Sequence, residues 1–310
     1  MTLNASGPIS LAGTLTGGSI ASELALGATT QISLNCTSVR TLAGVPSGAI
    51  IMPTNFYGKA NQYTYTVSAN QTNFCMRAGA VTAGWNGTTK LVVNINSGVI
   101  ISSNGTGTPA MTISGSYPNG VTVTNNGTIV GMGGNGANRT CSTGASGSTG
   151  GSALKVLSAV TFNNVNVLAG GGGGGGSGGT GIQGAPCCRV AYGYAGGGGG
   201  GRSSNVSNSS GGSPGGSAGT YSSAGGGGTG ANCTQFCRWN GYGGNGGTGG
   251  TWGAAGASGA LGGGSYPYCG ACSISYTVSG GAGGGGGKAT CGAGTYITWT
   301  GTGTRYGSIS

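Results

Sequence analysis

Ten cysteines carry the most reactive side chains of this sequence. In "CTQFC" (233–237) and "CGAC" (269–272) they stand close together, and C-x2-C is a spacing at which thiolates bind zinc. The chain has no histidine to complete such a site, and the pair "CC" (187–188) has no place in it. We therefore predict no metal site and favour disulfides, with free thiols as the alternative. The predicted disulfide cysteines are Cys187, Cys188, Cys233, Cys237, Cys269 and Cys272.

The chain has almost no side chains that could perform acid–base catalysis. Glu23 is the one carboxylate side chain, and aspartate and histidine are absent. General acid–base catalysis, a carboxylate-oriented triad and a hard-metal site all need such groups. The composition predicts a protein that is not an enzyme and that needs no cofactor.

The loops that carry the paired cysteines are also rich in aromatic residues. They span residues 180–194, 231–242 and 265–278. Exposed rings anchor protein receptors or pack on sugars, whereas buried rings would only cap the structure with apolar bulk. On the first interpretation, the candidate receptor-binding residues are Tyr192, Tyr194, Arg238, Trp239, Tyr242, Tyr266 and Tyr268.

Glycine runs separate these loops and must position them. Glycine supplies 79 of the 310 residues, and the longest run is Gly170–Gly176. A flexible linker is one interpretation of such runs. We favour a packed bundle of polyglycine II helices over residues 169–288, because linkers are poor in aromatic residues and seven residues of such a helix span roughly 22 Å. In a packed bundle, Gly173 and Gly198 should not tolerate valine.

The glycine runs also predict where the three loops lie. If each run reverses the direction of the chain, with residues 202–224 as one polar return and residues 251–252 as another, the three loops meet at one end of the bundle. If residues 211–219 count as a separate run, two of the loops lie at the opposite end.

Residues 60–168 change to a two-residue period that predicts strands. "YTYTV" (63–67) and "KLVVNINSGVIIS" (90–102) alternate β-branched or aromatic residues with polar ones. A partial repeat relates residues 109–134 to residues 152–173, which favours stacked coils of a β-solenoid, with a sandwich as the alternative. Residues 289–310 return to strand character and are expected to form a closing strand. The predicted fold is therefore mainly β and irregular.

Charge and targeting signals limit the partners of the chain. Eleven lysines and arginines give a net charge of +10, but they form no basic run, so we predict no nucleic-acid binding and only weak attraction to anionic surfaces. The N-terminus lacks the basic and apolar regions of a secretion signal. Many cysteines without an export signal suggest a protein that leaves the cell inside a virus particle at lysis.

Two terminal motifs resemble proteins of tailed bacteriophages. The segment "ISLNCTSVRTLAGVPSGAIIMPTNFYGK" (32–59) resembles the leader of a group of phage tail and fibre proteins, and "YITWTGTGTRYGSIS" (296–310) is similar to their C-terminal strand. Cys36 stands where that leader usually has an acidic residue. By composition, the middle of the chain resembles glycine-rich receptor-binding adhesins in which polyglycine II helices pack and variable loops contact the host.

This resemblance implies a host-attachment protein of the virion tail, extracellular after host lysis. Residues 1–59 would then dock onto the particle, and the loops would bind the host. The implied partners are other virion tail proteins and a host surface glycan or outer-membrane protein, with the chain itself in a homo-oligomer. The alternative function is a structural packing subunit of a tail, fibre or extracellular filament.

Overall fold

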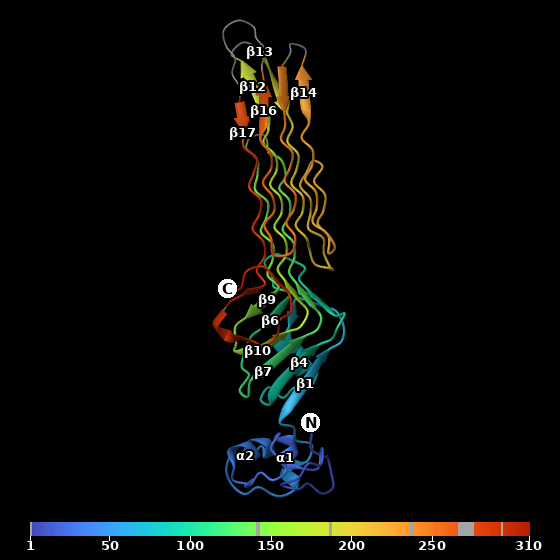
Figure 1. The fold of residues 1–310 in the computed structure, drawn as a ribbon, viewed down its shortest axis with the longest axis vertical. Coiled ribbons are helices and arrows are strands. Elements are labelled where there is room, and N and C mark those ends of the chain that lie inside the picture. Colours follow the sequence, from blue (N-terminus) through green and yellow to red (C-terminus); the bar gives the residue numbers. More distant parts are fainter. Residues whose placement is uncertain (1, 141–142, 186–187, 236–238, 266–275, 293) are drawn as a thin grey trace. The chain divides into compact units, whose positions relative to one another are not determined.

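The computed structural model describes two compact units of the chain (Figure 1). It covers residues 2–140, 143–185, 188–235, 239–265, 276–292 and 294–310. We call the units N-terminal and C-terminal. The N-terminal unit comprises Met1–Tyr65, Ala80–Val93 and Ser116–Thr122, and the C-terminal unit comprises Thr66–Gly79, Asn94–Gly115 and Val123–Ser310.

The N-terminal unit contains short helices around a small apolar core. They are α1 (Ile20–Glu23), α2 (Thr37–Ala43) and the 3-10 turn η1 (Thr54–Phe56). Helix α2 ends because Gly44 adopts a left-handed conformation, with φ of 74°. The core consists of Leu3, Ile9, Ile20, Val39, Leu42, Ala43 and Phe56. The one carboxylate side chain of the protein, Glu23, is buried here and accepts a hydrogen bond of 2.9 Å from the Asn61 N–H.

Three sheets take up most of the strands outside the glycine-rich region. The first sheet contains, in order, β1 (Gln62–Val67), β4 (Lys90–Ile95), β7 (Val121–Asn125), β10 (Val160–Asn164) and β19 (Ile297–Trp299). The second contains β2 (Gln71–Thr72), β5 (Ile100–Ser102), β8 (Thr128–Val130), β11 (Val167–Ala169) and β20 (Arg305–Tyr306). The third contains β18 (Thr290–Cys291), β9 (Leu154–Val156), β6 (Met111–Ile113) and β3 (Phe74–Cys75). Helix α3 (Met76–Thr82) and the turn η2 (Gly294–Tyr296) complete these elements.

Parallel pairing places the two predicted repeats on top of each other. Met111 pairs with Leu154, and Thr128 pairs with Val167, each in a parallel register. The Asn–Asn step of each repeat also meets its counterpart, because Asn125 Nδ2 donates a buried hydrogen bond of 2.8 Å to Asn164 Oδ1. The strand prediction is confirmed, and the fold is mainly β with parallel sheets. The α3 helix was not expected from the alternating pattern.

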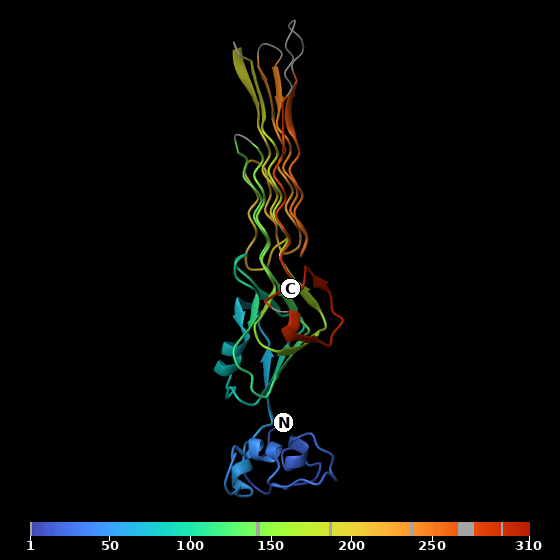
Figure 2. The same ribbon diagram turned by 90° about the vertical axis from the view of Figure 1, so that its left-hand side faces the viewer.

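The glycine-rich segments leave the sheets after β8 and β11 and run side by side (Figures 1 and 2). Residues 170–180 are buried at the centre. Three consecutive N–H groups, those of Gly172, Gly173 and Gly174, donate to three different neighbouring segments. The N–H groups three residues further on, beginning with Gly175, return to the same segments in the same order. The segments bonded to this central one are 134–137, 145–151, 196–202, 244–250, 254–260 and 281–287.

Glycine is required in these segments because neighbouring backbones lie too close together to leave room for a Cβ atom. A Cβ atom on Gly173 would lie 2.0 Å from the carbonyl oxygen of Gly284, and one on Gly198 would lie 2.0 Å from that of Gly175. Real Cβ atoms never come this close to another heavy atom. Side chains appear instead where segments face solvent, as at Asn245, whose Oδ1 accepts the otherwise unpartnered Gly230 N–H at 2.8 Å.

An aromatic cluster lies at the end of the glycine-rich region that adjoins the sheets, which we call the foot. Trp252 is 9% exposed and packs with Val130 of β8 and Ala169 of β11, so it sits where the segments leave the sheets. The Arg202 guanidinium lies 3.6 Å from the Trp252 ring centroid, and the Tyr221 ring lies 5.2 Å away. Residues 251–252 form the expected reversal between segments 244–250 and 254–260, which pair in opposite directions.

One expected connection is wrong. The sequence suggested that residues 202–224 make a single polar return. Instead, residues 210–213 accept hydrogen bonds from residues 136–139, and residues 217–220 accept them from residues 200–203. This stretch therefore adds short segments of its own to the packed region, because its glycines and serines are small enough to approach the neighbouring backbone. No helix within the described residues is long and apolar enough to cross a membrane.

Alanine substitutions should separate buried from outward-facing glycines. We expect Gly173→Ala to lower the free energy of unfolding by about 2 kcal/mol or more, because its Cβ must displace backbone. At Gly285 the nearest atom to an added Cβ is Thr149 Cγ2 at 3.6 Å, an ordinary contact. Gly285→Ala should leave stability unchanged or raise it by up to about 1 kcal/mol. Equal melting temperatures for the two variants would contradict this packing.

Candidate functional site

Six strands gather at the end of the glycine-rich segments away from the sheets (Figures 1 and 2). One antiparallel pair is β12 (Gly181–Ala185) with β13 (Cys188–Gly193). A second antiparallel sheet contains β14 (Asn232–Gln235), β15 (Trp239–Tyr242), β16 (Gly262–Ser265) and β17 (Tyr276–Val278). The two sheets are in contact, with β13 beside β14 and β15 and with β12 beside β16 and β17. The three segments that carry cysteines and rings therefore meet at one end, which we call the distal end.

Two of the predicted receptor-binding tyrosines are exposed at the distal end. Tyr194 is 47% exposed and its backbone exchanges two hydrogen bonds with Ala231, of 2.9 and 2.7 Å. Tyr242 is 44% exposed, and its ring lies over the backbone of Gly263, where an added Cβ would come within 2.6 Å of the ring. Glycine at 263 thus leaves room for the ring to lie flat on the neighbouring strand.

The remaining candidates are placed only by their backbone or not at all. Tyr192 belongs to β13 and Trp239 to β15. Arg238, Tyr266 and Tyr268 lie outside the described residues.

The cysteine predictions fall largely on the same undescribed parts. Cys188 and Cys233 lie in β13 and β14, and the other four predicted disulfide cysteines, Cys187, Cys237, Cys269 and Cys272, lie outside the described residues. Cys36, Cys75 and Cys291 are free thiols. Where the structure describes the chain, no three potential metal-binding side chains come together. Disulfide formation at the distal end stays a prediction.

Arg139 is a distal-end residue that the sequence did not single out. It lies near the end of the glycine-rich segment 131–140, and its guanidinium carbon is 4.9 Å from the Tyr194 ring centroid. Its N–H donates to the Ser213 carbonyl at 2.9 Å. Because no side-chain pattern links residue 139 to residue 194, only the packing of the glycine-rich segments reveals the pair.

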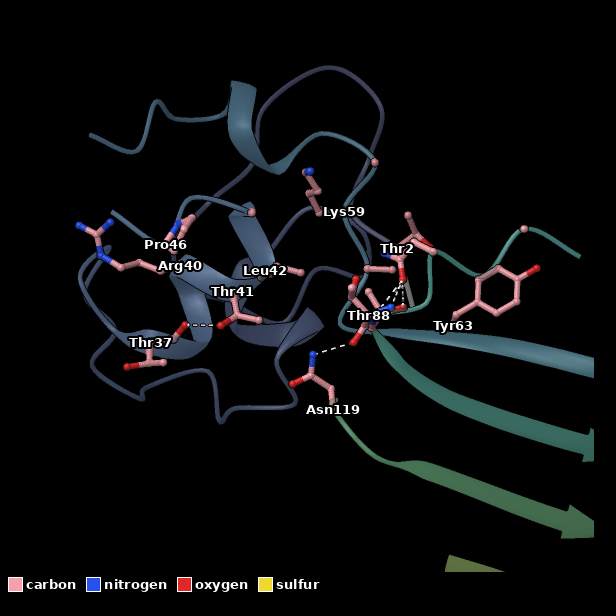
Figure 3. A pocket seen from close by; sticks show the side chains of 16 residues that line it. Thr2, Thr37, Arg40, Thr41, Leu42, Pro46, Lys59, Tyr63, Thr88 and Asn119 are labelled. Carbon is pink, nitrogen blue, oxygen red and sulfur yellow. Dashed lines mark hydrogen bonds between the residues drawn. The ribbon is translucent and has the colours of Figure 1, made fainter. Parts of the chain in front are cut away.

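A polar pocket of about 880 Å³ lies within the N-terminal unit (Figure 3). Figure 3 shows α2, with Thr41 and Leu42, on one side and Thr88 and Asn119 on the other. Asn119 Nδ2 donates to the Thr88 carbonyl at 2.8 Å, which fixes that wall. Threonine and asparagine side chains supply hydroxyl and amide groups to the lining, and Lys59 adds a positive charge. The sequence had pointed to none of these side chains.

The charged side chains that line the pocket, Arg40 and Lys59, are both cationic. Two hydrogen bonds hold the Arg40 side chain in place. Its Nε donates to Asn35 Oδ1 at 3.0 Å, and its Nη1 donates to the Gly48 carbonyl at 3.1 Å. No carboxylate, histidine or cysteine lines the pocket. Tyr63, which lines the pocket, and Tyr65 both belong to β1. Burial, and to a smaller extent the neighbouring Tyr63, raises the pKa of the Tyr65 phenol, which is neutral at physiological pH.

Comparison with known proteins identifies the family. No curated protein sequence matches the chain. Its fold is similar to that in the crystal structure of the gp37–gp38 adhesin tip complex of the bacteriophage S16 long tail fibre, with 21% identity, a TM-score of 0.50, and coverage of 87% of this chain and 90% of that chain. Residues 62–310 match the sequence profile of the phage tail fibre adhesin Gp38. Because this match spans most of the sequence, the chain belongs to the Gp38 family of phage tail fibre adhesins.

Proposed function

We propose that this chain recognises the host cell surface through the residues displayed at its distal end. The observation that carries the proposal is the exposure of Tyr194 and Tyr242 on neighbouring segments of one rigid scaffold. Rings that are half exposed on fixed backbone can enter a partner's surface with little loss of side-chain entropy, which is the usual character of binding hot spots. A host surface glycan or an outer-membrane protein is the partner class.

The glycine-rich segments serve as the support for this surface, and we infer that they are polyglycine II helices. A helix with three residues per turn directs successive N–H groups in three directions, and this is the order in which Gly172, Gly173 and Gly174 donate. The six hydrogen-bonded neighbours of segment 170–180 fit hexagonal packing of such helices. Rigidity follows, because the central backbone is bonded on all sides.

The N-terminal unit supplies the particle-docking surface. The family profile begins at residue 62, so the preceding helices α1 and α2 lie outside it and have a separate core. The S16 structure is a complex of gp38 with gp37, and we propose that this chain likewise binds a long tail fibre protein. The polar pocket beside α2 offers that partner hydrogen-bonding groups. The boundary at residue 59 and the homo-oligomer remain predictions.

The adhesin proposal is tested by binding to host cells. The purified full-length chain should bind host cells and reduce phage adsorption. The double variant Tyr194→Ser/Tyr242→Ser should bind about tenfold more weakly or worse, since exposed aromatic anchors contribute on the order of 2 kcal/mol. Tyr296→Ser is the control, because Tyr296 is 46% exposed but lies in η2, directly before β19 of the first sheet. Unchanged binding by the double variant would favour a structural packing subunit.

The docking proposal is tested by removing residues 1–59. The remaining chain should keep the melting transition of the C-terminal unit, because the apolar core of the leader is a separate cluster. It should nevertheless be missing from purified particles, as measured by quantitative mass spectrometry. Truncated chain at normal copy number in particles would refute the docking role.

The six distal-end cysteines are proposed to form three disulfides that fasten the displayed segments. Unreduced, denatured protein should then take up four alkyl groups by intact mass: those of the free thiols Cys36, Cys75 and Cys291, together with Cys141. A disulfide of this kind restricts the unfolded chain and typically stabilises by about 2–4 kcal/mol. Uptake of ten alkyl groups would exclude it.

A further inference from the structure

Three arginine side chains in the described part of the chain lie over aromatic rings. Arg202 lies 3.6 Å from the ring centroid of Trp252, Arg305 lies 4.6 Å from that of Trp299, and Arg139 lies 4.9 Å from that of Tyr194. Each contact restrains a guanidinium through its attraction to the ring face. The pairs differ in how exposed the arginine and its ring are, and this difference indicates their roles.

The Arg202 pair is structural. Its Nε donates to the Tyr221 carbonyl at 2.9 Å, and the Trp252 ring beneath it is buried. Arg139 has the opposite character, because its side chain is exposed. The ring near it, that of Tyr194, is also exposed, and its centroid lies 4.9 Å from the guanidinium carbon.

Backbone contacts on both sides hold the Arg139 pair in place. The Arg139 N–H is bonded to Ser213, and the Ser213 N–H donates in return to Asn138 Oδ1 at 2.8 Å. Tyr194 is fixed by its pair of hydrogen bonds to Ala231. A guanidinium that is stacked and anchored in this way loses little entropy when it binds a ligand.

No carboxylate neutralises Arg139. The sequence contains no aspartate, and its one glutamate, Glu23, is buried in the N-terminal unit. An exposed, planar guanidinium matches the paired oxygens of a phosphate or a carboxylate. The neighbouring segment 211–213 carries glycine and serine, which present small polar groups. Such surroundings suit sugar hydroxyls.

We propose that Arg139 and Tyr194 form an anion subsite for a phosphorylated or carboxylated sugar of the host surface. Arg139 binds the anionic group with its N–H edge, and Tyr194 is a positioning residue that orients the guanidinium. The inference rests on the proposed adhesin function and adds to it a residue and a ligand class. It also adds Arg139, at the end of segment 131–140, to the recognition surface of the displayed loops.

Binding to defined glycans tests the subsite. The probes are immobilised lipopolysaccharide with a phosphorylated inner core, the same material after removal of its phosphates, polygalacturonate, and its carboxyl-reduced form. The full-length chain should bind the anionic member of at least one pair about tenfold more tightly than its neutral partner. The pair that shows the preference tells phosphate from carboxylate. Equal binding to the anionic and neutral forms of both pairs would overturn the inference.

Matched variants assign the effect to Arg139. Arg139→Gln should lose the preference for the anionic form, and Arg139→Lys should keep only part of it, because an ammonium lacks the two-pronged geometry. Tyr194→Phe should retain the preference and Tyr194→Leu should reduce it. Arg305→Gln, which breaks a similar arginine–ring contact at β20, should change nothing. If Arg139→Gln binds like the wild type while its melting temperature is unchanged, the subsite does not exist.

Host-cell adsorption separates this inference from the adhesin proposal. If the wild type adsorbs and Arg139→Gln adsorbs equally well, the adhesin function stands and the subsite fails. If the wild-type chain does not bind host cells at all, the adhesin proposal is wrong, even if the chain binds the purified glycans. Adsorption that is lost after protease treatment of the cells but survives periodate oxidation of their glycans would identify a protein receptor and overturn the subsite.

Discussion

Contact between backbones that carry no Cβ atoms is the constraint on which this protein depends. Around Gly173 the nearest neighbours are carbonyl groups, and the 2.0 Å that would separate a Cβ from the Gly284 oxygen leaves no room for any other residue. The backbone polar groups of the central segment satisfy one another across six neighbours. Glycine, the residue that costs most entropy to order, is therefore distributed by packing geometry and not by flexibility.

This constraint concentrates ordinary side chains at the two ends of the glycine-rich region. At the foot, Trp252 joins Val130 and Ala169 of the strands, so an apolar contact attaches the packed segments to the sheets. At the distal end, Tyr194 and Tyr242 project from strands that continue the glycine-rich segments. A substitution at such a ring leaves the packed backbone contacts intact, so the displayed residues can vary while the support is unchanged. The recognition surface that we propose for this phage tail fibre adhesin is thereby separate from its scaffold.

The sequence predicted those parts of the fold in which side chains alternate. Val121 and Val123 point inward on β7, as their two-residue period indicates, and the repeat paired Met111 with Leu154. The meeting of the three distal-end segments also followed from counting the reversals between glycine runs, although residues 202–224 do not form the single return that this count assumed. The lateral order of those runs did not, because identical glycines give one neighbour no preference over another. Arg139 was missed for this reason, as its partner Tyr194 is fixed only by that lateral order.

The effect of each charged side chain also depends on where the packed segments place it. A net charge of +10 suggests attraction to any anionic surface, but at physiological ionic strength exposed charges are screened beyond about 8 Å. Scattered cations such as Lys155 and Lys288 therefore contribute little to selectivity. A guanidinium that is stacked on a ring acts within hydrogen-bonding distance, where screening is weak and geometry decides the partner. On the proposal made here for Arg139 and Tyr194, selectivity arises where the glycine-rich scaffold fixes a cation beside an exposed ring, and not from the net charge.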